Sequence, residues 1–417
     1  MLSSLSNAWK IPELRKKILF TLLMFVVFRI GCHIPVPGID KTLLSGFFQS
    51  DIFGWIDIIS GGSFKNLTIF AMGIIPYINA SIIVQLLTMV VPYFQRLQRA
   101  GQEGRKKMAQ WIRYGAVVLG AAQAIIMSVY LNKAMINPGI LSILVCTICL
   151  TAGTALLMWI GEQITENGIG NGISLIIFAG IVSRLPSGIN TIYEYVSTGS
   201  VSIIAVIIFL IAALLMIAAV VAVQEGQRRI TVQYSKRVVG RRVYGGQSTH
   251  IPMKINQAGV IPIIFAMAIL TFPTVIAGFF PNGSFAQWIS RAFAYDSALY
   301  IILYAILIFL FSYFYTAATF NTVEVADNMR KNGGFIPGLR PGRPTAEYLD
   351  KVLSRLTFSG AAFLTIIALL PSICMAATKM NLYFGGTSLL IAVGVALDTM
   401  KQIESHLLMR HYQGFMK

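Results

Sequence analysis

Apolar segments long enough to cross a lipid bilayer recur along the chain, and they constrain its fold more than any other feature. A transmembrane helix needs roughly 20 mostly apolar residues, and backbone polar groups in lipid are satisfied only in helices or closed barrels. The sequence offers about ten such segments. They lie at 18–32, 70–91, 114–131, 140–164, 173–185, 201–223, 258–280, 298–319, 357–377 and 387–403. We therefore expect an all-α polytopic membrane protein.

The small share of charged residues agrees with this expectation. Of the 417 residues, 56% are hydrophobic and only 12% are charged, whereas a soluble domain carries about 25% charged residues. Segment 18–32 is not followed by a small-residue cleavage site, so a cleavable signal peptide is not expected. The four cysteines (Cys32, Cys146, Cys149 and Cys374) lie in or at the ends of apolar segments. We interpret them as small packing residues rather than as a redox or metal site.

Lysine and arginine are distributed unevenly between the connecting segments. If the N-terminus lies inside, the inner segments hold 26 of the 33 Lys and Arg residues. Cytoplasmic loops are enriched in these residues, so we expect both termini in the cytoplasm. The net charge of +17 is concentrated in those loops. This favours contact with anionic lipids or acidic partners over sequence-specific binding of nucleic acid.

The order of the spans suggests two halves. We expect an amphipathic N-terminus at 1–17, a first half at 18–190, a second half at 191–405 and a cytoplasmic tail at 406–417. Spans 70–91 and 258–280 occupy matching places and begin with similar runs, AMGIIP and AGVIP. An odd number of spans in each half inverts the second half, so the two would be related by an axis in the membrane plane.

Two connecting segments carry signals of their own. A short amphipathic helix is predicted at 54–63, directly before span 70–91, and it is too short to cross the bilayer. Interrupted segments beside a span often line a cavity, so we interpret this stretch as a pore wall with its own stopper. In the basic loop at 225–256, residues 229–234 alternate as in a strand, and 243–244 are its expected hairpin partner. A second basic loop is expected at 321–356.

The sequence offers little for catalysis or ion coupling. It contains no H-E-x-x-H and no serine nucleophile elbow, and its histidines do not cluster with carboxylates. Coupled transporters place ionisable residues near mid-membrane. Here Arg29 lies within span 18–32, where it either snorkels or lines an aqueous cavity, and Glu162 is expected to cap a span at the surface. The Gly-rich stretch 168–172 predicts a tight turn between two spans. We expect no enzyme, catalytic residue, metal or cofactor.

Six sequence runs resemble the SecY family, the channel subunits of the bacterial protein-conducting translocon. They are 28–37 (FRIGCHIPVP), 70–87 (FAMGIIPYINASIIVQLL), 161–177 (GEQITENGIGNGISLII), 246–262 (GQSTHIPMKINQAGVIP), 327–342 (DNMRKNGGFIPGLRPG) and 383–391 (YFGGTSLLI). The resemblance implies an hourglass pore between two five-span halves, closed at its waist by a ring of aliphatic side chains.

The resemblance also implies roles for particular residues. The pore ring would consist of Ile78, Ile82, Ile177, Ile181, Ile264 and Ile391. The plug segment would consist of Gly54, Trp55, Ile56, Asp57, Ile58, Ile59, Ser60, Gly61 and Gly62. Gln85 and Phe272 are candidates for the lateral gate, and Arg241, Arg242 and Arg340 for docking of SecA and the ribosome. Residues four apart on a helix share a face, as in the pairs Ile78 with Ile82 and Ile177 with Ile181.

The function implied by the resemblance is passage of unfolded secretory proteins across a bacterial plasma membrane, with lateral release of signal and transmembrane helices into lipid. The expected partners are SecE- and SecG-type small membrane subunits, the SecA ATPase, the ribosome, precursor proteins and anionic lipids. The alternative is a secondary transporter of small solutes, against which the scarcity of midplane charge argues. An insertase or scaffold without a conduit would not need a plug.

Overall fold

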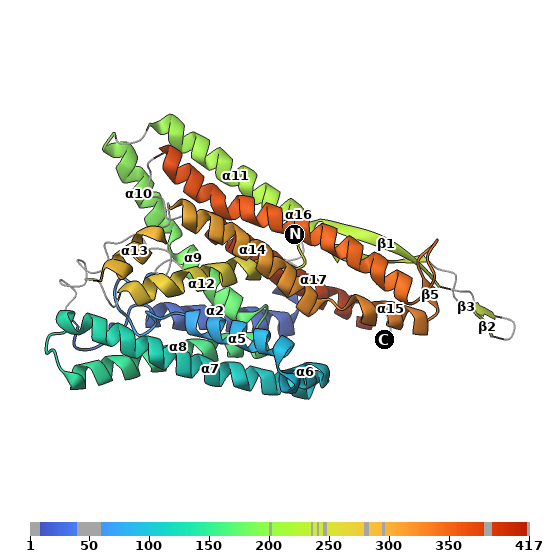
Figure 1. Cartoon of the computed structure of the whole chain (residues 1–417), viewed down its shortest axis with the longest axis horizontal. Helices are drawn as coiled ribbons and strands as arrows, with labels where there is room; N and C mark the ends of the chain where they lie inside the picture. The colour runs from blue at the N-terminus through green and yellow to red at the C-terminus, as the bar shows by residue number, and fades with distance from the viewer. Residues whose placement is uncertain are drawn as a thin grey trace.

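The structure, a computed structural model, describes residues 9–39, 60–199, 202–234, 237–239, 242–244, 248–278, 283–293, 297–378 and 386–414. Long helices dominate and run side by side (Figure 1). Those before residue 200 are α2 (Pro12–Gly31), α5 (Ile75–Val90), α6 (Pro92–Arg99), α7 (Gly101–Tyr130), α8 (Ile140–Asn167), α9 (Gly172–Ser183) and α10 (Leu185–Ser197), with the 3₁₀ turn η2 (Leu131–Ala134). Those after it are α11 (Ile203–Glu225), α12 (Ile261–Gly278), α13 (Ser284–Ala292), α14 (Ala298–Thr319), α15 (Thr322–Lys331), α16 (Arg343–Thr378) and α17 (Gly386–Gly414).

The expectation of a helical membrane protein is confirmed at the level of class. Each of the ten predicted spans overlaps one of these helices. By length and composition, six helical stretches of the described chain are able to cross a membrane, or seven if the bent pair of α5 and α6 counts as one. The count of ten spans and their inverted symmetry stay predictions.

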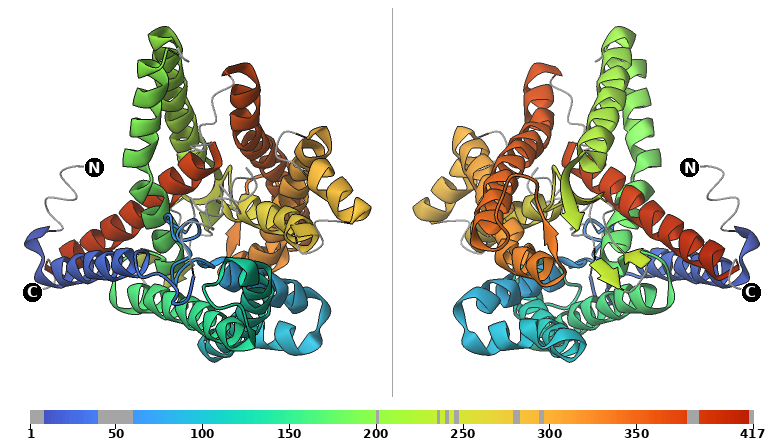
Figure 2. Two further views of the ribbon diagram at one scale, coloured as in Figure 1. Left: turned by 90° about the vertical axis from the view of Figure 1, so that its left-hand side faces the viewer. Right: turned by 90° about the vertical axis from the view of Figure 1, so that its right-hand side faces the viewer.

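The largest hydrophobic cluster lies where the two halves of the chain meet. It takes buried side chains from α2, α5, α8 and α9 of the first half and from α12, α14, α16 and α17 of the second. At one end of the molecule, α2 and α17 lie side by side (Figure 2). Leu14 of α2 and Ile403 of α17 are buried there in one small cluster. The halves are therefore joined by apolar packing along much of their length.

Helix α5 begins later than the sequence predicted. The expected span started at residue 70, but residues 70–74 form turns and the helix begins at Ile75. Pro76 is tolerated in the first helical turn and disfavours helical backbone in the residue before it. Gly73 has a φ of +57°, which also ends any regular helix there. After Val90 the chain bends by 99° into α6.

The loop between α11 and α12 forms a sheet, although not with the predicted pairing. The strand prediction at 229–234 is confirmed by β1 (Gln227–Tyr234). Its partners are β4 (Ser248–Lys254) and β5 (Gly334–Phe335), so the predicted pairing with 243–244 is wrong. Those two residues lie in β3 (Arg242–Tyr244), which pairs with β2 (Arg237–Val239). Pro252 within β4 hid the true partner, because proline argues against a strand.

The Gly-rich turn between α8 and α9 joins three helices by hydrogen bonds. The N–H of Ile169 donates to Oγ1 of Thr21 on α2 at 3.2 Å, and the N–H of Gly170 donates to Oε1 of Gln402 on α17 at 2.9 Å. The side chain of Asn171 caps α9 by accepting from the N–H of Ser174. The tight turn expected from the sequence is thus also a contact between the two halves of the chain.

Candidate functional site

The six isoleucines of the predicted pore ring lie in one cluster. Ile78 and Ile82 come from α5, and Ile177 and Ile181 come from α9. These four are buried, as is Ile391 of α17, and the half-buried Ile264 of α12 packs against the same cluster. Four helices from both halves of the chain thus bring aliphatic side chains to one place.

Helical periodicity explains why both pairs enter the cluster. Residues four apart lie one turn above each other on the same face. On α5, Ile78 and Ile82 are buried, whereas Ile83, one residue further on, is 46% exposed. On α12, Ile269 is 41% exposed while its neighbours Ala268 and Leu270 are buried. The faces that meet in the cluster are therefore distinct from the exposed faces of the same helices.

An aliphatic constriction, as the resemblance implies for these isoleucines, can act as a seal without a charged filter. A narrow apolar passage loses its water and so blocks ions. A charge at mid-bilayer costs roughly 2.5–3.5 kcal/mol on insertion scales. Since aliphatic side chains make no directional bonds, they are able to pack around a polypeptide of any sequence.

Only the end of the predicted plug segment is described. Gly54 to Ile59 lie outside the described residues. Ser60, Gly61 and Gly62 are buried, and they form turns where the sequence predicted the end of a helix. Gly61 and Gly62 have φ values of +66° and +92°, and this left-handed backbone breaks a helix.

Arg29, for which the sequence left two interpretations open, contacts a distant segment of the chain. It lies in the last turn of α2, and its Nη1 donates to the carbonyl oxygen of Gly61 at 2.8 Å. The arginine therefore binds backbone of the protein itself. No local sequence signal predicted this contact, because the two residues are far apart along the chain.

The two candidates for the lateral gate lie on adjacent helices. Gln85 is half-buried on α5, and its carbonyl oxygen accepts a hydrogen bond from Oγ1 of Thr88 at 2.6 Å. Phe272 lies on α12, and the placement of its side chain falls outside what the structure describes. Helices α5 and α12 contact each other, so the two halves of the chain meet along them.

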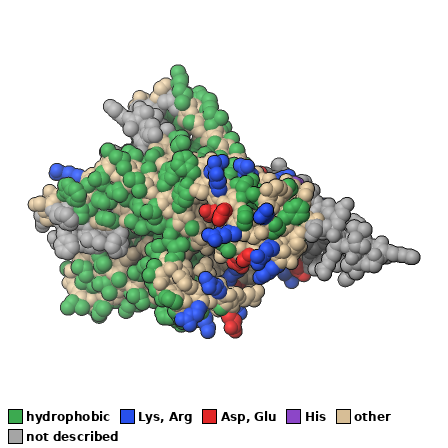
Figure 3. Space-filling model, turned by 45° about the vertical axis from the view of Figure 1, so that its right-hand side comes forward, with side chains coloured by type: hydrophobic (Ala, Val, Ile, Leu, Met, Phe, Trp, Pro, Cys, Tyr) green, Lys and Arg blue, Asp and Glu red, His purple; other side chains and the backbone are tan. Residues whose placement is uncertain are grey.

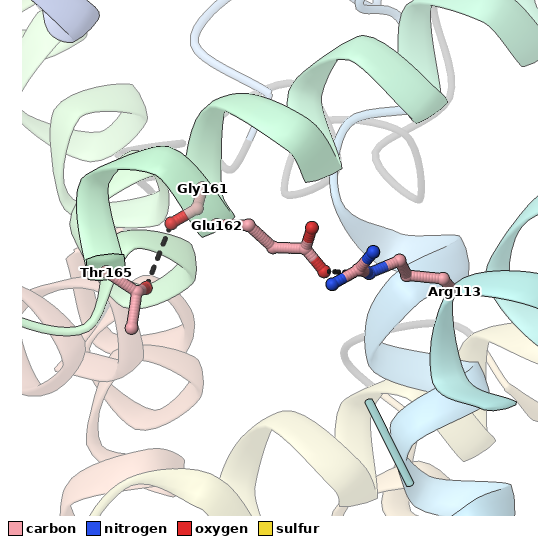
Figure 4. Close-up of polar contacts among 4 residues, drawn as sticks. All are labelled: Arg113, Gly161, Glu162 and Thr165. Carbon is pink, nitrogen blue, oxygen red and sulfur yellow. Dashed lines mark hydrogen bonds and ion pairs between the residues drawn. The ribbon is translucent and has the colours of Figure 1, made fainter. Parts of the chain in front are cut away.

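An ion pair between α7 and α8 was missed from the sequence (Figure 4). The Nε of Arg113 donates to Oε1 of Glu162 at 2.6 Å. Arg113 lies inside α7 and Glu162 inside α8, and the two side chains face each other. Glu162, which we expected to cap a span at the surface, thus pairs with a neighbouring helix. Opposite charges on neighbouring helices could have suggested the pair, but only with the helix contact known.

The basic loops fold against each other at one end of the molecule. Buried residues of β1, β4, α15 and α16 share a small core. Arg340 lies in the exposed turn before α16, where its carbonyl oxygen accepts from Oγ1 of Thr345 at 2.9 Å. Arg242 begins β3, and Arg241 lies outside the described residues. On the face drawn in Figure 3, most Lys and Arg side chains gather toward this end, with a few Asp and Glu among them, while hydrophobic side chains are frequent over the remainder.

No metal site is found in the part of the chain that the structure describes. Nowhere in it do three or more His, Cys, Asp or Glu side chains come together in a group that could hold a metal ion.

Comparison with known proteins places this geometry in a class. The chain resembles a solved structure described as "The structure of a protein conducting channel", with a TM-score of 0.68 and 20% identity over 94% of this chain and 92% of that one. It also resembles Sec61 in the canine ribosome-channel complex, with a TM-score of 0.65 and 19% identity. That match covers 94% of this chain and 92% of the other. The fold is that of the protein-conducting channels.

Sequence relatives define the family within that class. The SecY family model matches residues 68–400. Proteins named protein translocase subunit SecY from Halalkalibacterium halodurans, Thermotoga maritima and Bacillus subtilis are 47%, 46% and 46% identical, over all of this chain and 98–100% of theirs. The chain belongs to the SecY family.

Proposed function

We propose that this chain is the pore subunit of a bacterial Sec translocon. It passes unfolded secretory proteins across the plasma membrane and releases signal and transmembrane helices laterally into lipid. The observation that carries the proposal is the gathering of the pore-ring isoleucines from four helices into one cluster between the two halves of the chain. The SecY relatives support this function over transport of small solutes.

The channel consists of ten spans in two inverted halves, with both termini in the cytoplasm. The overlap of every predicted span with a helix supports the count. The orientation is supported by the inner segments, which hold 26 of the 33 Lys and Arg residues. The basic end with α6, α15 and β1 then faces the cytoplasm, and α10 and α13 lie on the opposite side (Figure 1).

The chain does no chemistry itself, so the driving force comes from partners. SecA and the ribosome dock on the basic loops through Arg241, Arg242 and Arg340, and the ribosome-bound Sec61 structure supports a docking surface of this kind. Small SecE- and SecG-type subunits complete the complex. Many side chains of α10 and α11 are exposed and apolar, which supports contact with lipid or with a further membrane helix in that region.

Reconstitution tests this function directly. The purified chain, with its small subunits, is placed in vesicles together with SecA and ATP. We expect a signal-bearing precursor to become protected from protease, and a precursor without its signal to stay accessible. If the vesicles instead take up a small solute without ATP, driven by an ion gradient, and the precursor stays unprotected, the alternative of a secondary transporter would be supported.

A further inference from the structure

We propose that the turn at residues 60–62 is a fixed anchor, which Arg29 pins to the first half of the chain and which stays in place while the channel works. We call it the 60–62 anchor. The proposal rests on the proposed function of the chain as a protein-conducting channel. It makes Arg29 a positioning residue for the backbone of the 60–62 anchor.

Two consecutive carbonyl groups of the anchor contact the end of α2. The Nη1 atom of Arg29 donates to the carbonyl oxygen of Gly61 at 2.8 Å. The Sγ atom of Cys32 lies 3.8 Å from the carbonyl oxygen of Ser60. Hydrogen bonds from a charged donor are stronger than neutral ones. This one is formed with backbone that is itself buried, where an unmet carbonyl is costly.

The end of α9 closes the other side of the anchor. A Cβ atom on Gly61 would lie 3.3 Å from both the Cα of Gly180 and the Oγ of Ser183. A Cβ atom on Gly62 would lie 3.0 Å from Nη2 of Arg184. Both glycines also have left-handed backbone, which other residues adopt only with strain. The anchor therefore fits a narrow slot between α2 and α9 that accepts glycine.

The chain that follows the anchor is also held by the first half. The N–H of Thr68 donates to the carbonyl oxygen of Ser63 at 3.0 Å, and the N–H of Ile69 donates to that of Ile34 at 3.0 Å. The N–H of Val36 donates to the carbonyl oxygen of Leu67. Backbone hydrogen bonds thus tie the segment from the anchor to α5 against the chain that follows α2. The segment 60–69 therefore moves together with the first half of the chain.

A disulfide tests whether the anchor stays in place. The Cys32 side chain interacts with the side chain of Ser63, directly after the anchor, so Ser63→Cys puts a thiol beside the native Cys32, and oxidation then fastens this end of the anchor to α2. We expect the disulfide to form and the SecA-driven import rate to stay unchanged. Ser63→Cys with Cys32→Ser, oxidised in the same way, controls for effects of the oxidant. Failure of the disulfide to form, or arrest of import that a reductant reverses, would overturn the anchor.

Removal of the Arg29 guanidinium group provides a second test. Arg29→Gln should raise the ion conductance of the resting channel about tenfold, because loss of a charge-assisted hydrogen bond frees the anchor more often. Lys65→Gln removes an exposed cation from the same external segment and should leave conductance unchanged. Equal conductance in the Arg29 variant and in wild type would contradict the proposed role of Arg29 in holding the anchor. Wild-type channels that import no precursor would refute the proposed function instead, so the two failures are distinguishable.

Discussion

Ile78 of α5 and Ile391 of α17 lie in the same hydrophobic cluster, although their helices belong to opposite halves of the chain. In the proposed channel these two side chains belong to one seal, which exists only while the two halves are held together. We therefore expect separation of the halves to open the proposed passage.

The first prediction concerns the tightness of this seal. Ile78→Asn should raise the ion conductance of the resting channel and let precursors with weak signals pass. Loss of a buried isoleucine removes roughly 1.5–3 kcal/mol of apolar burial, and the added amide helps water enter the constriction. Single-channel recording in a planar bilayer and an export assay with a defective signal measure the two effects. Ile391→Asn should act in the same direction.

The matched control for Ile78 is on the same helix. Ile83→Asn makes the same chemical change at a position that is 46% exposed, outside the cluster. It should leave both conductance and signal selection near wild type. Equal effects of the two variants would remove the basis for assigning Ile78 to the ring.

The second prediction concerns the exposed turn before α16. Arg340→Glu should impair SecA-driven export while the channel still assembles, because an exposed residue contributes little to folding and a reversed charge repels an acidic partner. Lys351→Glu makes the same change in charge on α16, where Lys351 is also exposed. Import into vesicles at several SecA concentrations compares them. A loss of import common to both variants would indicate a general effect of charge rather than docking at Arg340.

The third prediction concerns the ion pair between α7 and α8. Glu162→Gln or Arg113→Gln alone should lower stability by about 1–2 kcal/mol, a value reduced for the 43% exposure of the arginine side chain. The exchange of Arg113→Glu with Glu162→Arg should recover part of the loss, since the charges again oppose. Thermal unfolding in detergent measures the effect. The exchange variant is compared with Arg113→Glu alone and with Glu162→Arg alone. If it is no more stable than the less stable of these two, the ion pair contributes nothing specific.

The fourth prediction concerns a close approach of backbones. A Cβ atom on Gly153 of α8 would lie 1.8 Å from the carbonyl oxygen of Ile69, just before α5. Gly153→Ala should therefore destabilise the protein by about 1–3 kcal/mol or more through overpacking. Gly139→Ala is the control, because nothing lies within 4 Å of a Cβ there and its φ of 175° suits any residue. Equal melting temperatures for the two variants would contradict this packing.

Much of the fold was predictable because lipid imposes a simple rule on sequence. Apolar length predicted where the helices lie, and the period of 3.6 residues predicted that Ile78 and Ile82 share a face. Alternation predicted β1. These are local signals, and each is written within a short stretch of chain.

The features that were missed depend on contacts between distant segments. The pair of Arg113 with Glu162 and the bond from Arg29 to Gly61 each join residues on different elements. The partner of β1 was obscured by Pro252, which suggests a loop when it is considered alone. The late start of α5 depended on Pro76 and Gly73, whose local effect was outweighed in the prediction by the apolar run around them.

Cross-linking from the ring tests the central claim most directly. A photoreactive side chain at Ile264 is compared with one at Ile269, which is 41% exposed on the same helix, while a precursor is stalled halfway through import. We predict adducts from Ile264 with hydrophilic segments of the precursor, and adducts from Ile269 with lipid or with apolar segments only. Adducts with hydrophilic precursor segments from Ile269 but not from Ile264 would contradict a path through the pore ring.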